Sequence, residues 1–168
     1  EIVMAANKDP KFMELIKKDA DLVTADGIGI VLGGKMLKTP VKERVTGYDL
    51  FTWLLHVGNL RKLRVYLIGA TPAVMKITKA KIAKDYPGIE LVGAEDGYFK
   101  DDLKTVAKRI ENTEPDLVFA AIGFPRQEEL ISLLRQAEVP AIMMGVGGSF
   151  DVFSGAVKRA PKVFQKTH

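Results

Sequence analysis

An acidic residue, Asp26, follows the short apolar stretch 21–25 and comes directly before Gly27. A carboxylate at the end of a buried strand can act as a general base when its surroundings set its pKa suitably. Aspartate is also a common N-cap where a helix begins. The sequence leaves both interpretations of Asp26 open, and Thr24 beside it is a further candidate for contact with a substrate.

Three glycines within four residues end the apolar run 141–144. Glycines at the end of a strand let the backbone approach a ligand, because no Cβ is in the way. A helix that begins there presents N–H groups to an anion, and the basic pair that follows can hold phosphate. The segment indicates a site for a phosphorylated ligand, or else a strand-to-helix turn with a solvated basic end. The candidate contacts are Gly145, Gly147, Gly148, Asp151, Lys158 and Arg159.

Three further side chains follow glycines or precede helix starts. Arg44 lies just before a capping Thr46 and can reach a phosphate, or can simply belong to a surface loop. Tyr98 follows Gly97 and can stack on a nucleobase or pack at a sheet edge. Gln127 opens a helix after Gly-Phe-Pro and can both donate to and accept from a ligand, or face solvent in the first turn. The lysines of segment 72–86 are expected to form a solvated face.

Composition excludes several classes of site. The 168 residues include no cysteine and two histidines, which argues against thiolate chemistry, a His-based zinc site and a Ser-His triad. Segment 29–35 almost has the spacing of a P-loop, but Met36 stands where Ser or Thr would bind magnesium. Segment 27–32 lacks the third glycine of a dinucleotide fingerprint. The net charge of +4 suits a polyanionic small ligand or an anionic membrane surface and is too low for a dedicated nucleic-acid binder.

The elements that must position these residues follow from hydrophobic periodicity. Helical spacing covers the first 18 residues, with Pro10 opening a second helix. Short apolar runs predict strands, and longer amphipathic segments predict helices. The predicted strands are 21–25, 63–68, 89–94, 116–122 and 140–144, and the predicted later helices are 28–37 (buried), 48–60, 72–86, 101–113 and 126–137.

Alternation of these strands and helices predicts one α/β, Rossmann-like domain with a mostly parallel sheet and helices on both faces. Glycines follow nearly every predicted strand, at Gly27, Gly69, Gly97, Gly123 and Gly145. In open α/β sheets, ligands bind at the carboxyl ends of the strands. The candidate residues are therefore expected at one edge of the sheet.

Taken together, these segments resemble the WecG/TagA/CpsF glycosyltransferase family, glycosyltransferase family 26. The resemblance covers nearly the whole chain, and the matching pieces come in the family's order. They are Ala25-Asp-Gly-Ile-Gly-Ile-Val31, Glu43-Arg-Val-Thr-Gly-Tyr-Asp-Leu50, Gly97-Tyr-Phe99, Pro115-Asp116, Gly123-Phe-Pro-Arg-Gln-Glu128, Gly145-Val-Gly-Gly-Ser-Phe-Asp151 to Gly155, and Lys158-Arg-Ala-Pro161.

The resemblance implies an inverting transfer of N-acetylmannosamine from UDP-N-acetylmannosamine to the 4-hydroxyl of N-acetylglucosamine on undecaprenyl diphosphate, in wall teichoic acid synthesis. Asp26 aligns with the family's proposed base. The diphosphate or sugar is expected at Arg44, Gln127, Lys158 and Arg159, and the uridine at Tyr98 and Asp151. No Asp-x-Asp pair follows a predicted strand, which fits a transferase without a divalent metal or other cofactor.

The resemblance also implies a bacterial, cytoplasmic enzyme, peripheral at the inner face of the membrane and homo-oligomeric. Relative to the family, both ends look truncated: an N-terminal Thr-Pro-Asn segment and a C-terminal appendage that engages the membrane are missing. The chain as given is therefore expected to fold and to be weakly active or inactive. Alternatives are a transferase for another UDP-sugar (N-acetylmannosaminuronic acid or glucose) and a non-catalytic nucleotide-binding assembly subunit. A dinucleotide-dependent oxidoreductase would need the fingerprint that fails.

Overall fold

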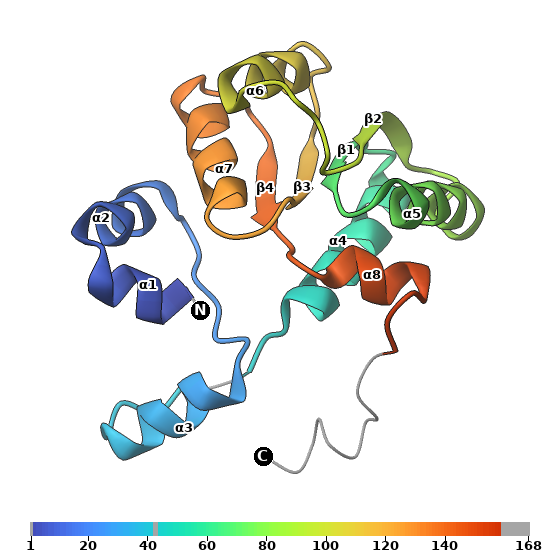
Figure 1. Cartoon of the computed structure of the whole chain (residues 1–168). Coiled ribbons are helices and arrows are strands. Elements are labelled where there is room, and N and C mark those ends of the chain that lie inside the picture. The colour runs from blue at the N-terminus through green and yellow to red at the C-terminus, as the bar shows by residue number, and fades with distance from the viewer. Residues whose placement is uncertain (1, 42–43, 159–168) are drawn as a thin grey trace.

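The computed structural model describes residues 2–41 and 44–158, which divide into two regions (Figure 1). The N-terminal arm (described residues up to 46) carries three helices, and the sheet body (47–158) carries the sheet and the helices around it. The arm contains α1 (Ile2–Lys8), α2 (Pro10–Asp19) and α3 (Ile28–Met36). The body contains α4 (Gly47–Arg61), β1 (Arg64–Gly69), α5 (Pro72–Asp85), β2 (Glu90–Glu95), α6 (Leu103–Glu111), β3 (Leu117–Ala121), α7 (Arg126–Gln136), β4 (Ile142–Gly145) and α8 (Ser149–Ser154).

The four strands of the described residues form one parallel sheet in the order β2-β1-β3-β4. The central strand β1 pairs with both β2 and β3, so Tyr66 lies between Gly93 and Val118. The chain moves outward in one direction to β2, then crosses back to β3 and β4. This confirms the predicted α/β fold, and the reversal beside β1 is the point at which such sheets bind ligands.

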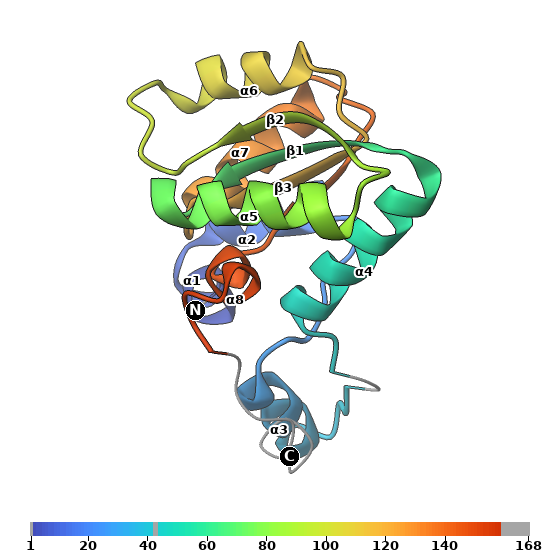
Figure 2. The same ribbon diagram turned by 90° about the vertical axis from the view of Figure 1, so that its right-hand side faces the viewer.

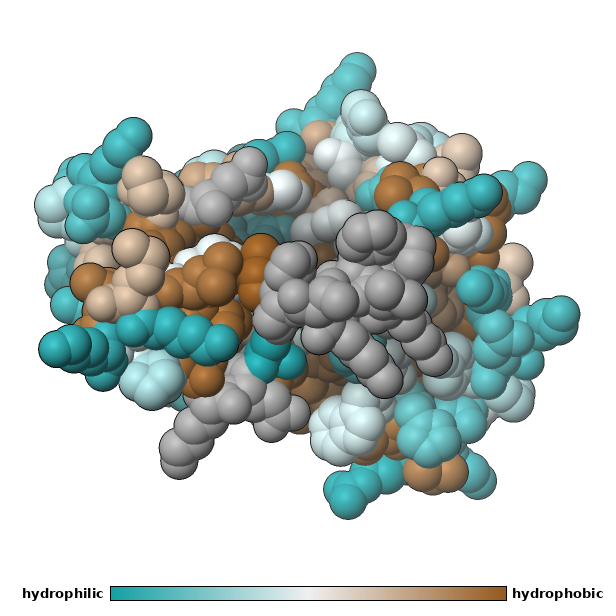
Figure 3. All heavy atoms as spheres, turned by 90° about the horizontal axis from the view of Figure 1, so that it is seen from below, coloured by the Kyte–Doolittle hydropathy of each residue, from teal (hydrophilic) through white to brown (hydrophobic). Residues whose placement is uncertain are grey.

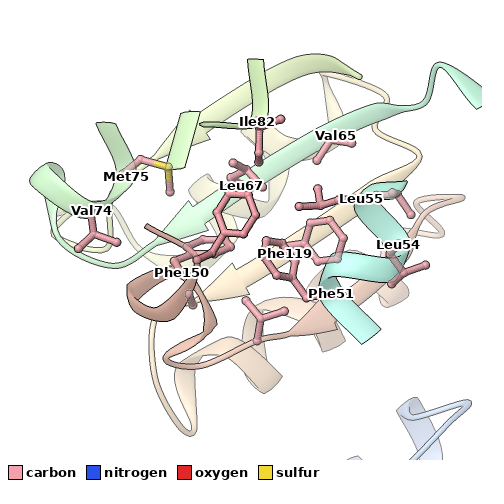
Figure 4. Packing of buried hydrophobic residues seen from close by; sticks show 14 residues of the cluster. Phe51, Leu54, Leu55, Val65, Leu67, Val74, Met75, Ile82, Phe119 and Phe150 are labelled. Atoms are coloured by element: carbon pink, nitrogen blue, oxygen red, sulfur yellow. The ribbon is translucent and has the colours of Figure 1, made fainter. Parts of the chain in front are cut away.

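Alternating strand residues feed two cores, one on each face of the sheet. Leu67 and Phe119 point toward α4, α5 and α8, where the ring of Phe119 meets Phe51 edge-on with the centroids 4.9 Å apart (Figure 4). Ile68 and Val118 point to the opposite face, where they pack with buried side chains of α6 and α7. Helices therefore cover both faces, as predicted, and the edge-on view in Figure 2 shows α5 and α6 on opposite sides of the strands.

The residues at the starts of α2 and α4 cap these helices, as the sequence indicates. Pro10 begins α2 behind the cap Asp9, whose carboxylate accepts the N–H of Lys11 at 2.9 Å. Thr46 caps α4 by accepting the N–H of Asp49 at 3.1 Å, and its hydroxyl donates to the Asp49 carboxylate at 2.6 Å. These caps satisfy backbone donors that the first turn leaves free.

Two predictions for the arm are wrong. Segment 21–25 is not a strand: it runs extended without pairing, and Leu22 and Val23 are 73% and 70% exposed. Its ends are tied to α7 and to the start of α4 by side-chain contacts, which hold it without a strand ladder. Helix α3 forms but is not buried, since none of its residues falls in the core. It projects from the rest of the molecule (Figures 1 and 2), so its apolar side chains Ile30, Leu32 and Met36 stay exposed instead of packing against the body.

Candidate functional site

The carboxyl ends of all four strands meet at one edge, as the parallel registers require. Hydrogen bonds join the loops that follow the strands: the Ala70 N–H donates to the Ala121 carbonyl at 3.0 Å, and the Gly97 N–H donates to the Ala70 carbonyl at 2.8 Å. Gly69 has a φ of +129°, and a Cβ there would lie 2.3 Å from the Ala121 backbone. Only glycine fits this approach, which brings the loops after β1 and β3 together at the reversal of the sheet.

Asp26 lies at the N-terminus of α4, not in either place that the sequence offered. Its Oδ2 accepts the N–H of Gly47 at 3.0 Å, while the following helix α3 begins at Ile28 behind Gly27, which provides no side-chain cap. Arg44 donates from Nε to the Asp26 backbone carbonyl at 2.5 Å, and its guanidinium lies 3.8 Å from Asp26 Oδ1. The side chain of Asp26 remains 56% exposed, so a substrate hydroxyl has access to the carboxylate.

Gln127 and Glu128 begin α7 beside the end of β4. Gln127 is only 6% exposed, and its Nε2 donates to Glu128 Oε1 at 2.9 Å. The amide lies over Gly145, where a Cβ would come within 2.8 Å of Nε2. Gln127 Oε1 and Glu128 Oε2 are buried and have no hydrogen-bond partner among the described residues. Burial raises the pKa of Glu128, against the lowering effect of the Gln127 hydrogen bond.

A cavity of about 710 Å³, which we call the arm groove, separates the arm from β4 and α7. Thr24, Gln127 and Gly145 all line it, so the structure brings these three predicted site residues together. Asp26 and Arg44 adjoin this group, because Gly47 lies within reach of both Asp26 Oδ2 and the Met144 methyl group. The groove therefore opens beside the candidate base.

Tyr98 lies apart from this group, in a second hollow of about 530 Å³ formed by α5 and the end of β2. Its ring is 72% exposed, and Lys76, Lys79 and Asp96 line the same hollow. An exposed aromatic beside two lysines can stack on a base and attract phosphate. The lysines of α5 are exposed, as predicted, and two of them also border this hollow.

The glycine segment after β4 begins a short helix, as predicted. Gly147 has a φ of +47° and Gly148 is the N-cap of α8. Asp151 lies in the first turn of α8 and is partly exposed. Lys158 is exposed beyond the helix, and Arg159 lies outside the described residues.

Sequence reasoning did not select Glu128, Lys76 or Lys79, which line the two hollows together with candidate site residues. The signal for Gln127 and its neighbour was the periodicity of α7, since Gln127 shares the buried face with Leu130 and Leu134. A polar residue on the core-facing side of a helix, next to a strand end, indicates a buried binding residue more strongly than its position in the first helical turn does. No comparable pattern singles out two of the lysines of α5.

Membrane spans and metal clusters are both absent from the part of the chain that the structure describes. Within residues 2–41 and 44–158, no helix combines the length and hydropathy that crossing a bilayer requires. The same residues contain no cluster of three or more His, Asp or Glu side chains arranged to hold a metal ion. The expectation of a metal-independent reaction stays a prediction.

A parallel sheet that reverses direction beside a glycine-lined edge is typical of nucleotide-binding α/β domains. The sequence model of the "Glycosyl transferase WecG/TagA/CpsF family" matches residues 1–168. The chain belongs to this family, which confirms the resemblance seen in its motifs.

Three relatives carry the name "N-acetylglucosaminyldiphosphoundecaprenol N-acetyl-beta-D-mannosaminyltransferase". The protein of Bacillus spizizenii (strain W23) is 44% identical over 168 residues, which is 100% of this chain and 65% of the relative. That of Bacillus subtilis (strain 168) is 42% identical over 96% of this chain and 62% of the relative. That of Staphylococcus aureus (strain NCTC 8325) is 38% identical over 99% of this chain and 65% of the relative. The chain thus spans slightly less than two thirds of the length of these relatives.

Proposed function

We propose that this chain is the nucleotide-sugar domain of an N-acetylmannosaminyltransferase that acts on N-acetylglucosaminyl-diphosphoundecaprenol. The observation that carries the proposal is the similarity to relatives of that name, which extends over the whole of this chain at 38–44% identity. The donor would be UDP-N-acetylmannosamine, and the reaction would form part of wall teichoic acid synthesis.

Inverting transfer needs a base on the acceptor side and electropositive groups on the leaving group. The acceptor O4 attacks the anomeric carbon of N-acetylmannosamine while the bond from that carbon to the diphosphate oxygen breaks. The O4 proton passes to Asp26, and UDP leaves with the bonding electrons. Asp26 suits this role because its carboxylate is exposed beside Arg44 and is held by the Gly47 N–H.

Leaving-group stabilisation is proposed for Arg44, for the loops at the carboxyl edge, and for Lys158 and Arg159. The uridine is assigned to the Tyr98 hollow, where Lys76 and Lys79 lie within the same surface. Gln127, fixed against Gly145, is proposed to contact the sugar. No divalent metal is required in this scheme, because cationic side chains take the charge of the departing diphosphate.

The acceptor is a membrane lipid, so we propose that the protein works at the inner face of the cell membrane. Sedimentation with anionic vesicles tests this, and sedimentation velocity tests the proposed homo-oligomer. Vesicle binding no stronger than that of a neutral control protein would contradict the first, and a monomer at micromolar concentration would contradict the second.

A transfer assay tests the activity. It uses UDP-N-acetylmannosamine, UDP-N-acetylmannosaminuronic acid or UDP-glucose with a lipid-diphosphate N-acetylglucosamine, with and without EDTA. Two proteins are compared: this chain, and this chain extended by the additional segments that its relatives carry. UDP release that persists in EDTA, and is fastest with UDP-N-acetylmannosamine, supports the proposal. UDP binding by calorimetry without transfer from any donor would favour a non-catalytic nucleotide-binding subunit.

A further inference from the structure

The arm groove is lined mainly by apolar side chains. Leu50 and Ile131 form part of its walls, and Leu22, Val23 and Ile142 line it while remaining 73%, 70% and 57% exposed. Exposed apolar side chains that gather around one hollow mark a binding surface. In the view from below, Figure 3 shows hydrophobic surface on the arm side of the molecule, where α3 projects toward the viewer and presents a second apolar surface.

The groove follows β4 from one end to the other. Val139 and Ala141 line it before the strand begins, and Gly145 lines it where the strand ends. Four strand residues at roughly 3.3 Å each make this path on the order of 13 Å long. One end of the groove therefore lies at the candidate active site, at the carboxyl end of β4, and the other end lies at the amino end of this strand.

Two carboxylates of the groove have partners at its rim. Asp21 accepts from Arg135 in an ion pair, and Asp19 accepts from the hydroxyl of Ser132. The acceptors without a partner, Gln127 Oε1 and Glu128 Oε2, lie at the active-site end. These oxygens accept hydrogen bonds, so a ligand with sugar hydroxyls at one end and a hydrocarbon chain at the other would match this distribution.

We infer that the arm groove holds the first isoprene units of the acceptor's polyisoprenyl chain. The inference rests on the proposed function, which supplies a substrate of this chemistry. The diphosphate and sugar then lie beside Thr24, Gln127 and Asp26, and the chain runs along β4 between the arm and α7. A hydrocarbon chain needs only apolar walls and brings no donor or acceptor into the groove.

Calorimetric titration of this chain with allylic diphosphates tests the inference without requiring turnover. Farnesyl and dimethylallyl diphosphate share the same head and differ in chain length, and inorganic diphosphate has no chain. Farnesyl diphosphate, kept below its micelle concentration, is expected to bind at least tenfold more tightly than dimethylallyl diphosphate. Equal affinity for the two would overturn the inference.

Variants of the groove test where the hydrocarbon chain binds. Leu22→Asp and Ile142→Asp place a charge in the groove at exposed positions, so folding is preserved, and farnesyl affinity is expected to fall to the dimethylallyl level. Leu60→Asp is the matched control, since Leu60 is 68% exposed but does not line the groove. Met36→Asp tests the rival apolar surface of α3, where Met36 is 85% exposed. Loss of farnesyl binding in either control, with Leu22→Asp unaffected, would overturn the inference.

Two further readouts separate this inference from the proposed function and from self-association. Chain-length discrimination without sugar transfer by the extended chain would refute the activity and leave the groove as a lipid site. Transfer with the same KM for long-chain and methyl-diphosphate acceptors would retain the activity and refute the groove. Sedimentation velocity tests whether a second copy of the protein occupies the groove. An unchanged mass for Leu22→Asp would exclude the second copy, and a drop from dimer to monomer would overturn the inference.

Discussion

The sheet body and the arm are stabilised in different ways. Of the buried hydrophobic residues in the described chain, only Ala6 and Phe12 belong to the arm, and the rest fill the two cores of the body. The arm is attached to the body by an aromatic contact between Phe12 and Phe124 and by polar contacts of Asp19, Asp21 and Asp26. The candidate base and Arg44 therefore sit on the less firmly packed region, while Tyr98, Lys76 and Lys79, proposed to face the uridine, sit on the more densely packed body. Such a division is common where a site must open and close.

The largest effect is expected in the body. Phe119→Ala removes a fully buried ring from the centre of the core beneath α4, and should lower the free energy of unfolding by ~3–5 kcal/mol. Urea denaturation measures it, and Trp53→Ala is the control because Trp53 is 59% exposed and should change stability by about 0.5 kcal/mol or less. A loss below about 1 kcal/mol for Phe119→Ala would contradict the assignment of the body as the stable region.

In the arm, Phe12→Ala removes a buried ring and its edge-on packing against Phe124, but the loosely attached arm can relax around the gap, so the cost should be about 2–3 kcal/mol, below that of Phe119→Ala. The arm can open locally, so hydrogen exchange in residues 10–26 should accelerate while exchange in β1 and β3 stays slow. If the variant were destabilised as much as Phe119→Ala, the arm and the body would form one cooperative unit, and the two regions would not differ in stability.

Asp26→Asn tests the contact between the arm and the body, where Asp26 accepts the Gly47 N–H. Asparagine retains an oxygen for the Gly47 N–H but loses the charge at the N-terminus of α4, a cost of ~0.3–1 kcal/mol. Transfer should fall by about 10²-fold or more if Asp26 is the base. Asp9→Asn, at the cap of α2 in the same arm, should cost a similar amount of stability and leave transfer intact. Transfer that survives Asp26→Asn would reduce Asp26 to a structural cap.

The smallest effect concerns pH. Burial raises the pKa of Glu128, so the native state keeps this proton to a higher pH than the unfolded chain does. Stability is therefore lost as pH rises from the ordinary Glu value through the raised pKa, and the loss is complete above it. Glu128→Gln should match the wild type in acid and exceed its Tm by about 1–2 °C above the raised pKa. Calorimetric scans across pH measure this, with Glu14→Gln, on the exposed face of α2, as the control. A variant that melts lower than wild type at neutral pH would contradict it.

The same contrast explains what the sequence could predict. In the body, strands such as 63–68 and 116–122 alternate with amphipathic helices. The hydrophobic pattern of each strand or helix shows which of its faces is buried. The fold and the loops at the carboxyl edge were therefore predictable. Segment 21–25 has the composition of a strand, yet whether it pairs depends on how the arm meets β4, which no local pattern encodes. The bond from Asp26 to Gly47 joins residues 21 positions apart and was invisible for the same reason. Gln127 was chosen for its chemistry, although the helical stripe to which it belongs also indicates its burial.

The position of β4 at the end of the sheet has a consequence for solubility. Its outer edge is formed by Ile-Met-Met-Gly, without a charge or a proline, and no described residue forms a strand pair with it. An apolar edge of this kind is a template for pairing with another chain. The arm faces this edge across the groove, so variants that displace the arm should become prone to concentration-dependent aggregation well before the body unfolds.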